Sequence, residues 1–257
     1  DTFGNHTANV VTPITINAGG TVTNSGSFFN RLSTLTLNGG TLTSTGGATQ
    51  AGLDGPLAWA LAGSVTVNSS TQSTISGTGN VMLGSASVTG TTFNVSDGAA
   101  AIDLLVSANL INSSTSTWGT QQASSFTQTG AGTITLSGAN KYTGSTTISS
   151  ATLNLTGTLG NTSASAGSYA GTISNAGILN INTTATQTLS GVISGAGSFT
   201  QSGSGTTILS AANTYAGITT IGGGTLQVGA GGTSGTLGTG NVVDNGTLTI
   251  NRSDNYT

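Results

Sequence analysis

The chain has 257 residues, of which only 4% are charged, and its 3 basic and 6 acidic side chains leave a net charge of −3. Ordinary soluble proteins carry about 25% charged residues, and with Arg31 and Lys141 isolated from each other a nucleic-acid-binding surface is excluded. The absence of cysteine excludes disulfide and thiolate chemistry. No apolar run reaches the roughly 18 residues that a transmembrane helix needs.

Abundant glycine and serine with little charge are also typical of flexible, disordered polymers. The chain contains only 2 prolines, however, and is rich in the β-branched residues threonine, valine and isoleucine. Its apolar residues also recur regularly, which a linker does not need. The composition therefore predicts a folded chain.

Apolar residues alternate with threonine or serine along most of the sequence. Successive side chains of a strand point to opposite faces, so each run offers an apolar side chain to a core and a hydroxyl to solvent. The runs are short and end at Gly-Gly, Asn-Gly or Ser-Gly pairs, which mark turns. Residues 99–110 look partly helical but lack start and stop signals, and we predict strand there too. In chain order, the clearest predicted strands include residues 21–23, 34–37, 41–43, 64–67, 93–95, 133–136 and 247–250.

Two architectures suit many short alternating strands: an antiparallel sandwich or barrel, and a parallel β-solenoid. Two-residue hairpin patterns at regular spacing are nearly absent, which favours the solenoid. If one coil takes ~20–25 residues, the chain forms ~10–13 coils and a rod ~50–60 Å long. Scarce charge fits this fold, because like charges stacked on successive coils would repel.

A segment that occurs twice supports the solenoid. Residues 130–155 and 203–228 align without a gap, and the segments at 171–188 and 240–257 continue the match. Self-similarity at a fixed period is typical of stacked architectures, and a period of roughly 70 residues predicts about three turns of a smaller unit. The chain stops within its next period, so we expect residues 1–257 to be one continuous β-solenoid fragment of a longer protein.

The acidic residues do not form a convincing catalytic site. A glycosidase needs two carboxyl groups ~5–10 Å apart, and the nearest pairs in sequence are Asp97 with Asp103 and Asp244 with Asp254. Neither pair has a nearby histidine, lysine or glutamate, and the single histidine, His6, has no partners for a hydrolytic triad. We therefore interpret the acids near glycine as turn residues. No catalytic, cofactor-binding or metal-binding residue is assigned, and we predict that the chain is not an enzyme.

Asn140 and Tyr142 recur in the second copy as Asn213 and Tyr215. One interpretation is a periodic ligand-contacting stripe, since tyrosine is favoured in binding surfaces. The other is an asparagine turn and internal ladder beside a tyrosine that covers the edge of the core. We favour the second, because it follows directly from the stacked architecture.

Two surface hypotheses have weaker support. A flat array of Thr-x-Thr on a rigid face could bind ice, but an ice-binding face needs the motif on one side at every coil, and its spacing in the sequence is irregular. Asn-x-Ser/Thr triplets such as 68–70 and 112–114 are glycosylation acceptors in form. In a chain this rich in asparagine, serine and threonine they are expected by chance.

Residues 130–148, GAGTITLSGANKYTGSTTI, and residues 203–228 resemble the autotransporter-associated β-strand repeat, or passenger-associated transport repeat, of bacterial autotransporters. With the linking segments the resemblance extends over roughly residues 95–257, whereas residues 1–94 share only composition and alternation. Ser150-Ala151 departs from the usual Gly-Gly of the pattern. The resemblance implies a secreted right-handed parallel β-helix, exported across the outer membrane, whose repeats assist folding and export. It implies no activity.

Two functions follow as expectations. The first is a non-catalytic structural or adhesive protein, secreted or on the bacterial cell surface, whose partners are other copies of itself, host or neighbouring cells, or matrix glycans. Exposed coil ends and uncharged faces favour such self-association. The second is the stalk of an autotransporter passenger that carries a catalytic domain outside this fragment.

Overall fold

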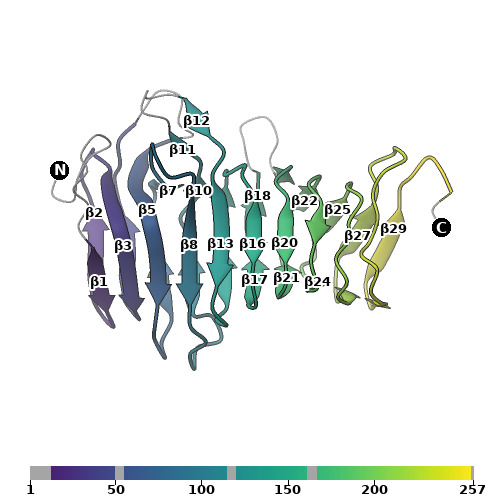
Figure 1. Ribbon diagram of the computed structural model, residues 1–257, viewed down its shortest axis with the longest axis horizontal. Helices are drawn as coiled ribbons and strands as arrows, with labels where there is room; N and C mark the ends of the chain where they lie inside the picture. The colour runs from purple at the N-terminus through teal and green to yellow at the C-terminus, as the bar shows by residue number, and fades with distance from the viewer. Residues whose placement is uncertain (1–12, 50–54, 115–119, 161–166, 256–257) are drawn as a thin grey trace.

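The computed structural model describes residues 13–49, 55–114, 120–160 and 167–255, and within them the regular structure consists of strands alone. The strands wind into a parallel β-helix whose successive coils stack along the long axis, with β1 and β29 at opposite ends (Figure 1). This is the fold class that the alternating pattern predicts. The β-helix has two long sheets, here called face 1 and face 2, and a third side made of shorter sheets.

Face 1 is a ten-stranded sheet that runs along the front of Figure 1. β7 and β10 attach to its side through β5. Its strands are β1 (Ile14–Asn17), β3 (Asn30–Asn38), β5 (Leu57–Val67), β8 (Gly90–Val95), β13 (Ser125–Thr129), β16 (Thr146–Ile148), β20 (Ile173–Asn175) and β23 (Ile193–Ser194), with β7 (Asn80–Leu83) and β10 (Leu110–Ile111).

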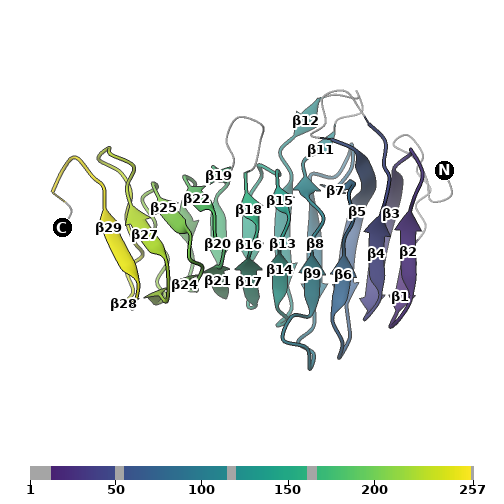
Figure 2. The same cartoon turned by 180° about the vertical axis from the view of Figure 1, so that it is seen from behind.

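Face 2 lies behind it, as the reversed view shows (Figure 2). Its ten strands all pair in parallel, one from each coil. They are β2 (Thr21–Asn24), β4 (Thr41–Ser44), β6 (Ser73–Ile75), β9 (Leu104–Val106), β14 (Ile134–Leu136), β17 (Thr152–Leu155), β21 (Ile178–Ile181), β24 (Ser198–Gln201), β26 (Thr219–Ile221) and β28 (Val242–Asp244).

The third side closes each coil. One short sheet joins β15 (Ala139–Asn140) to β18 (Thr158–Leu159), and a longer one joins β19 (Ser168–Tyr169), β22 (Thr186–Leu189), β25 (Thr206–Leu209), β27 (Thr225–Val228) and β29 (Thr247–Ile250). The hairpin of β11 (Ser113–Ser114) and β12 (Gln121–Gln122) is the one antiparallel strand pair in the described part of the chain.

The core is a set of ladders in which like residues stack from coil to coil. On face 2, for example, Leu153 pairs with Ile134 and with Leu179, and all three are fully buried. Aromatic rings form a second ladder: the centroids of Phe93 and Phe126 lie 4.9 Å apart in stacked geometry. Each such aromatic pair adds about 0.5–1.5 kcal/mol beyond its buried area. Stacking therefore supplies the core that one coil cannot form alone.

The number of coils and their lengths differ in part from the prediction. Face 2 contains ten strands, so the described rod is about 43 Å long at ~4.8 Å per coil, shorter than expected. Coils near the C-terminus are of the predicted size, since Thr200 pairs with Thr220. The first coil is also of that size, since Thr21 pairs with Thr41, but the next coils are longer, since Thr41 pairs with Thr74 and Thr74 with Leu105. The predicted coil length is wrong there.

Part of the extra length of these coils forms their third side: Trp59 of β5, Val81 of β7 and Leu110 of β10 face the main core, and β15 follows β10. The extra residues lengthen β3 and β5, add β7, β10 and the β11–β12 hairpin, and bury a second small core against them. That core consists of Phe29, Ala48, Leu57, Ala60, Met82 and Ile111. Because the insertions bulge from one side, the strands of faces 1 and 2 keep their stacking.

Glycines form a ladder at the corner between faces 1 and 2. A Cβ atom on Gly197 would meet the carbonyl oxygen of Gly177, and one on Gly217 would meet that of Gly197. The ~4.8 Å spacing between coils leaves no room for a side chain on the inner side of this turn. Residues 99–110, which looked partly helical, contain β9 and the start of β10 joined by loops.

Candidate functional site

The acidic residues Asp103 and Asp244 accept hydrogen bonds from backbone N–H groups. Asp103 is buried, and its carboxylate accepts the N–H groups of Gly98 and Thr133, both at 2.8 Å. Thr133 lies one coil further on, so the carboxylate ties two coils together. Asp97 is exposed in the same loop, and Asp244 closes a turn by accepting the N–H of Gly246 at 3.0 Å. The turn interpretation holds for Asp244, whereas Asp97 lies in an irregular loop and the buried, hydrogen-bonded position of Asp103 was not predicted.

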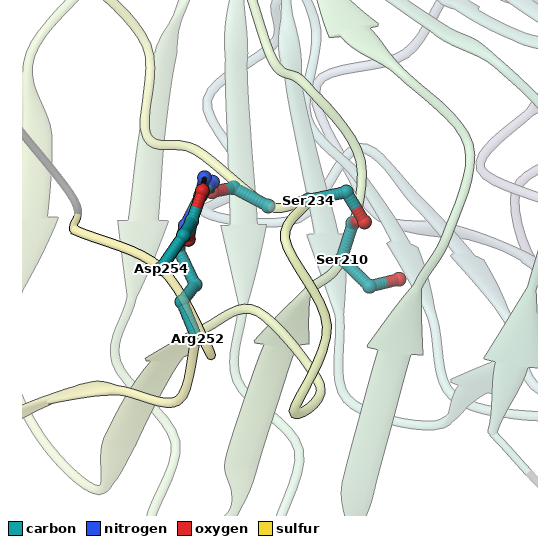
Figure 3. Close-up of polar contacts among 5 residues, drawn as sticks. Ser210, Ser234, Arg252 and Asp254 are labelled. Atoms are coloured by element: carbon teal, nitrogen blue, oxygen red, sulfur yellow. Dashed lines mark hydrogen bonds and ion pairs between the residues drawn. The ribbon is translucent and has the colours of Figure 1, made fainter.

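Asp254 is held by Arg252 in the one ion pair of the described residues (Figure 3). The guanidinium donates Nε to Oδ1 at 2.9 Å and Nη2 to Oδ2 at 2.8 Å, and this hydrogen bonding lowers the pKa of Asp254 below its usual value. Arg252 also donates to the carbonyl oxygen of Gly235, while Ser234 donates its hydroxyl to the carbonyl of Ser210 at 3.0 Å. These contacts fasten a glycine-rich loop to the neighbouring coils.

Asn140 bridges three consecutive coils. Its Oδ1 accepts the N–H of Leu110 at 3.1 Å from the coil before, and its Nδ2 donates to the carbonyl oxygens of Gly138 at 3.0 Å and of Thr158 at 3.2 Å. Thr158 belongs to β18 on the coil after. The side chain is fully buried, and its amide satisfies backbone groups of the neighbouring coils that the strand pairing leaves unbonded.

Asn213 repeats this arrangement. Its Oδ1 accepts the N–H of Ile193 at 2.8 Å, and its Nδ2 donates to the carbonyl oxygen of Thr236 at 2.7 Å. Ile193 again lies on the coil before and Thr236 on the coil after. The predicted internal role of these asparagines is confirmed, but Asn140 and Asn213 bridge different coils and do not stack on each other as a ladder.

The tyrosines of the doubled segment are fully buried. The hydroxyl of Tyr142 bonds Oγ1 of Thr146 at 2.9 Å, and that of Tyr215 bonds Oγ1 of Thr219 at 2.7 Å. Burial above all, and then the neighbouring phenol of Tyr169, raise the pKa of Tyr142 well above its usual value. A neutral phenol sealed in the core cannot contact a ligand at the surface, which rules out the stripe interpretation.

A buried glutamine in each copy escaped the sequence reasoning. Gln201 donates its Nε2 to the carbonyl oxygens of Gly203 at 2.9 Å and Gly205 at 3.3 Å, and its Oε1 accepts the hydroxyl of Thr207. Gln128 donates in the same way to Gly132, at 2.9 Å. Among the described residues no group donates to Gln128 Oε1, because isoleucine occupies the position that corresponds to Thr207.

A family model described as the passenger-associated-transport-repeat matches residues 126–155 and 199–228. The chain carries two passenger-associated-transport repeats. They are consistent with an autotransporter passenger domain that contains such repeats. Comparison with curated proteins and with solved structures found no match.

The matched repeats begin a few residues before the doubled segment aligned from the sequence. The added residues include Phe126 and Phe199 and the two buried glutamines, and they read FTQ in both copies from residues 126 and 199. Extending the alignment upstream of residue 130 would have found them. Each transport repeat thus contributes one buried glutamine, one buried asparagine and one buried tyrosine.

The two transport repeats lie one face apart. In the first repeat, β13 and β16 belong to face 1 and β14 and β17 to face 2. In the second, the corresponding β24 and β26 belong to face 2, and β25 and β27 to the third side. The period of the doubled segment therefore equals three coils plus one face, against the three turns predicted. The side-chain bonds survive this rotation because they depend on adjacent coils and not on a particular face.

Metal-binding and membrane features were also sought. In residues 13–49, 55–114, 120–160 and 167–255, histidine, cysteine, aspartate and glutamate nowhere gather in groups of three or more that could hold a metal ion. The same residues contain no helix of the length and apolarity needed to span a membrane.

Proposed function

We propose that this chain is a non-catalytic structural segment of a secreted or cell-surface autotransporter passenger, in which the transport repeats assist folding and export. The observation that supports this most strongly is the buried asparagine of each repeat, which bonds the coil before and the coil after. A repeat of this kind couples the folding of neighbouring coils.

The physical basis is the open edge of a growing solenoid. A finished coil presents unpaired backbone groups and a half-covered core, and the next coil gains its stability by pairing with them. Buried side-chain amides strengthen that coupling where the strand pairing leaves backbone groups unbonded. A chain that emerges from a membrane in sequence order can fold coil by coil on such a template, which would draw it outward.

The test is secretion of the full-length protein with Asn140→Ala and Asn213→Ala together. We expect less protease-resistant passenger outside the cell than for the natural sequence, with unchanged amounts of mRNA. Asn182→Ala is the matched control, because Asn182 is exposed on an adjacent turn. Unchanged secretion and protease resistance in the double variant would contradict the proposal.

The adhesive part of the proposal rests on the outer faces. They present threonine, serine and asparagine with almost no charge, and such faces suit contact with cell surfaces, matrix glycans or another copy of the chain. Binding of the purified chain to cells and to a glycan array tests this role. Absence of binding to both, together with a monomer at all concentrations, would leave only the structural role.

A further inference from the structure

Outward-facing hydroxyl side chains form two regular columns on face 1. Residues that pair across β3, β5, β8, β13, β16, β20 and β23 give the first column, and residues two positions further along β1, β3, β5, β8 and β13 give the second. The first column is Thr34, Ser64, Thr92, Thr127, Thr147, Ser174 and Ser194, and the second is Thr15, Thr36, Thr66, Asn94 and Thr129. Eleven of these twelve side chains, here called the hydroxyl array, carry a hydroxyl.

The array is regular in space although its members are irregularly spaced in the sequence. Thr36 pairs with Thr66 and Thr66 with Asn94, whereas Thr127 pairs with Thr147 after a much shorter stretch of chain. The additional residues of the long coils lie on the third side and do not interrupt face 1. Rows therefore repeat at ~4.8 Å along the axis, with ~6.6 Å between columns. The irregular sequence spacing that argued against an ice-binding face is thus absent from the folded surface.

The hydroxyls of the array are available to an outside partner. In the described part of the chain, Thr129 alone among the twelve bonds a protein group through its side chain, at 3.5 Å to the carbonyl of Phe93. Outward side chains elsewhere bond one another: on face 1 outside the array Asn38 donates to Asn17 at 2.9 Å, and on face 2 Asn180 donates to Asn154 at 3.0 Å. The hydroxyl array is therefore the better candidate for a contact surface.

The chemistry of the array restricts its ligand. None of the twelve positions holds a charged or aromatic residue, so the array lacks the Lys and Arg that bind phosphate and the Trp, Tyr and Arg that dominate protein interfaces. The columns also cover far less than the ~800 Å² per partner of a stable protein complex. An uncharged, flat and periodic ligand fits both facts.

We propose that the hydroxyl array of face 1 binds ice. Its strands run side by side with little change of direction (Figure 1), and their parallel register aligns the residues of the array in rows. The two repeats of the array lie close to the oxygen spacings on the prism face of hexagonal ice. Water held between the threonine methyls and bonded to their hydroxyls can then continue the crystal lattice.

Uptake into slowly growing ice tests the proposal, with the purified chain measured in the ice and in the liquid fractions. We expect enrichment in the ice over a reference protein without ice affinity. Thr66→Lys and, separately, Thr127→Lys should each reduce that enrichment about tenfold, the effect of losing one good contact. The matched control is Thr200→Lys, because Thr200 is an equally half-buried, outward-facing threonine on face 2 and should leave the enrichment unchanged.

Circular dichroism of each variant separates loss of binding from loss of folding. Equal amounts of the natural chain in ice and liquid would overturn the proposal, as would an equal loss for Thr200→Lys. Crystalline cellulose and chitin serve as probes of other lattices, and analytical ultracentrifugation as a probe of a second copy. Binding to cellulose or chitin, or self-association, that is lost in Thr66→Lys and Thr127→Lys would also overturn the ice-binding proposal if the chain is not enriched in ice.

Discussion

Asn213→Ala tests whether the asparagine of the repeat holds neighbouring coils together. The substitution removes the acceptor for the N–H of Ile193, at 2.8 Å, and the donor to the carbonyl oxygen of Thr236, at 2.7 Å. Ile193 is fully buried, so its N–H loses its partner and cannot reach water. Thr236 is half-buried, so water can replace the lost donor there.

The expected cost follows from these two environments. A buried donor left without a partner costs about 1–3 kcal/mol, and loss of an ordinary hydrogen bond adds about 1 kcal/mol. We therefore expect Asn213→Ala to lower the free energy of unfolding by about 2–4 kcal/mol. Asn140→Ala should give a similar result, because the N–H of buried Leu110 depends on it in the same way.

Urea unfolding followed by far-ultraviolet circular dichroism measures the change. The control is the exposed Asn182→Ala, which should stay within about 0.5 kcal/mol of the natural chain. Since solenoid coils can unfold in groups, hydrogen exchange of the Ile193 amide gives the local value directly. A loss below about 0.5 kcal/mol for Asn213→Ala would refute the reasoning, because a buried N–H group without a hydrogen-bond partner destabilises the fold by more than that.

Three further predictions concern the turns and the buried polar groups. Gly197→Ala should lower the free energy of unfolding by about 1–3 kcal/mol, because the new methyl group overpacks the turn. Gly232→Ala, where a Cβ atom meets nothing within 4 Å, should be nearly neutral. Equal effects of the two substitutions in thermal unfolding would contradict the glycine ladder. Thr207→Val removes the hydroxyl bonded to buried Gln201 Oε1 and should cost about 1–3 kcal/mol in urea unfolding, so a neutral result would count against that bond. The raised pKa of Tyr142 keeps its phenol protonated in the folded state while the unfolded chain ionises, so the free energy of unfolding should be steady below pH 10 and fall above it. Tyr142→Phe should make that fall with pH less steep. An equally steep fall in the variant would argue against the burial of Tyr142.

Much of the fold could be predicted because stacked strands produce a simple repeating pattern of apolar and polar residues in the sequence. A run such as Thr133–Leu136 shows its inward and outward faces by alternation, and the doubled segment shows that neighbours complete the core. These signals are local or strictly periodic. They led correctly to a parallel β-helix and to an internal role for Asn140 and Asn213.

Coil length could not be predicted from the same signals. The residues inserted between Thr41 and Thr74 include the apolar run LAWAL at 57–61, which does not alternate because both of its faces are buried. Trp59 and Leu61 face the main core, whereas Leu57 and Ala60 pack in the second small core. The run indicates a strand buried on both faces, but only tertiary packing shows what covers its outer face.

The buried polar groups were also only partly visible. Asp103 looks like a loop acid, and its burial depends on the N–H groups that Gly98 and Thr133 offer from two coils. The rotation of the second repeat by one face depends on the summed lengths of all the coils between the copies. Neither is encoded in a short window of sequence.

Disulfide formation between engineered cysteines tests the central claim, a parallel β-helix whose two transport repeats lie one face apart. The chain has no native cysteine, and outward residues on adjacent parallel strands lie ~4.8 Å apart, within reach of a disulfide. We predict that Asn180→Cys with Thr200→Cys forms a disulfide under mild oxidation, because these residues pair on face 2. Ser174→Cys with Thr200→Cys should remain reduced, because Ser174 lies on face 1. A disulfide in the second variant and not in the first would place the first strand of both repeats on face 1 and contradict the account.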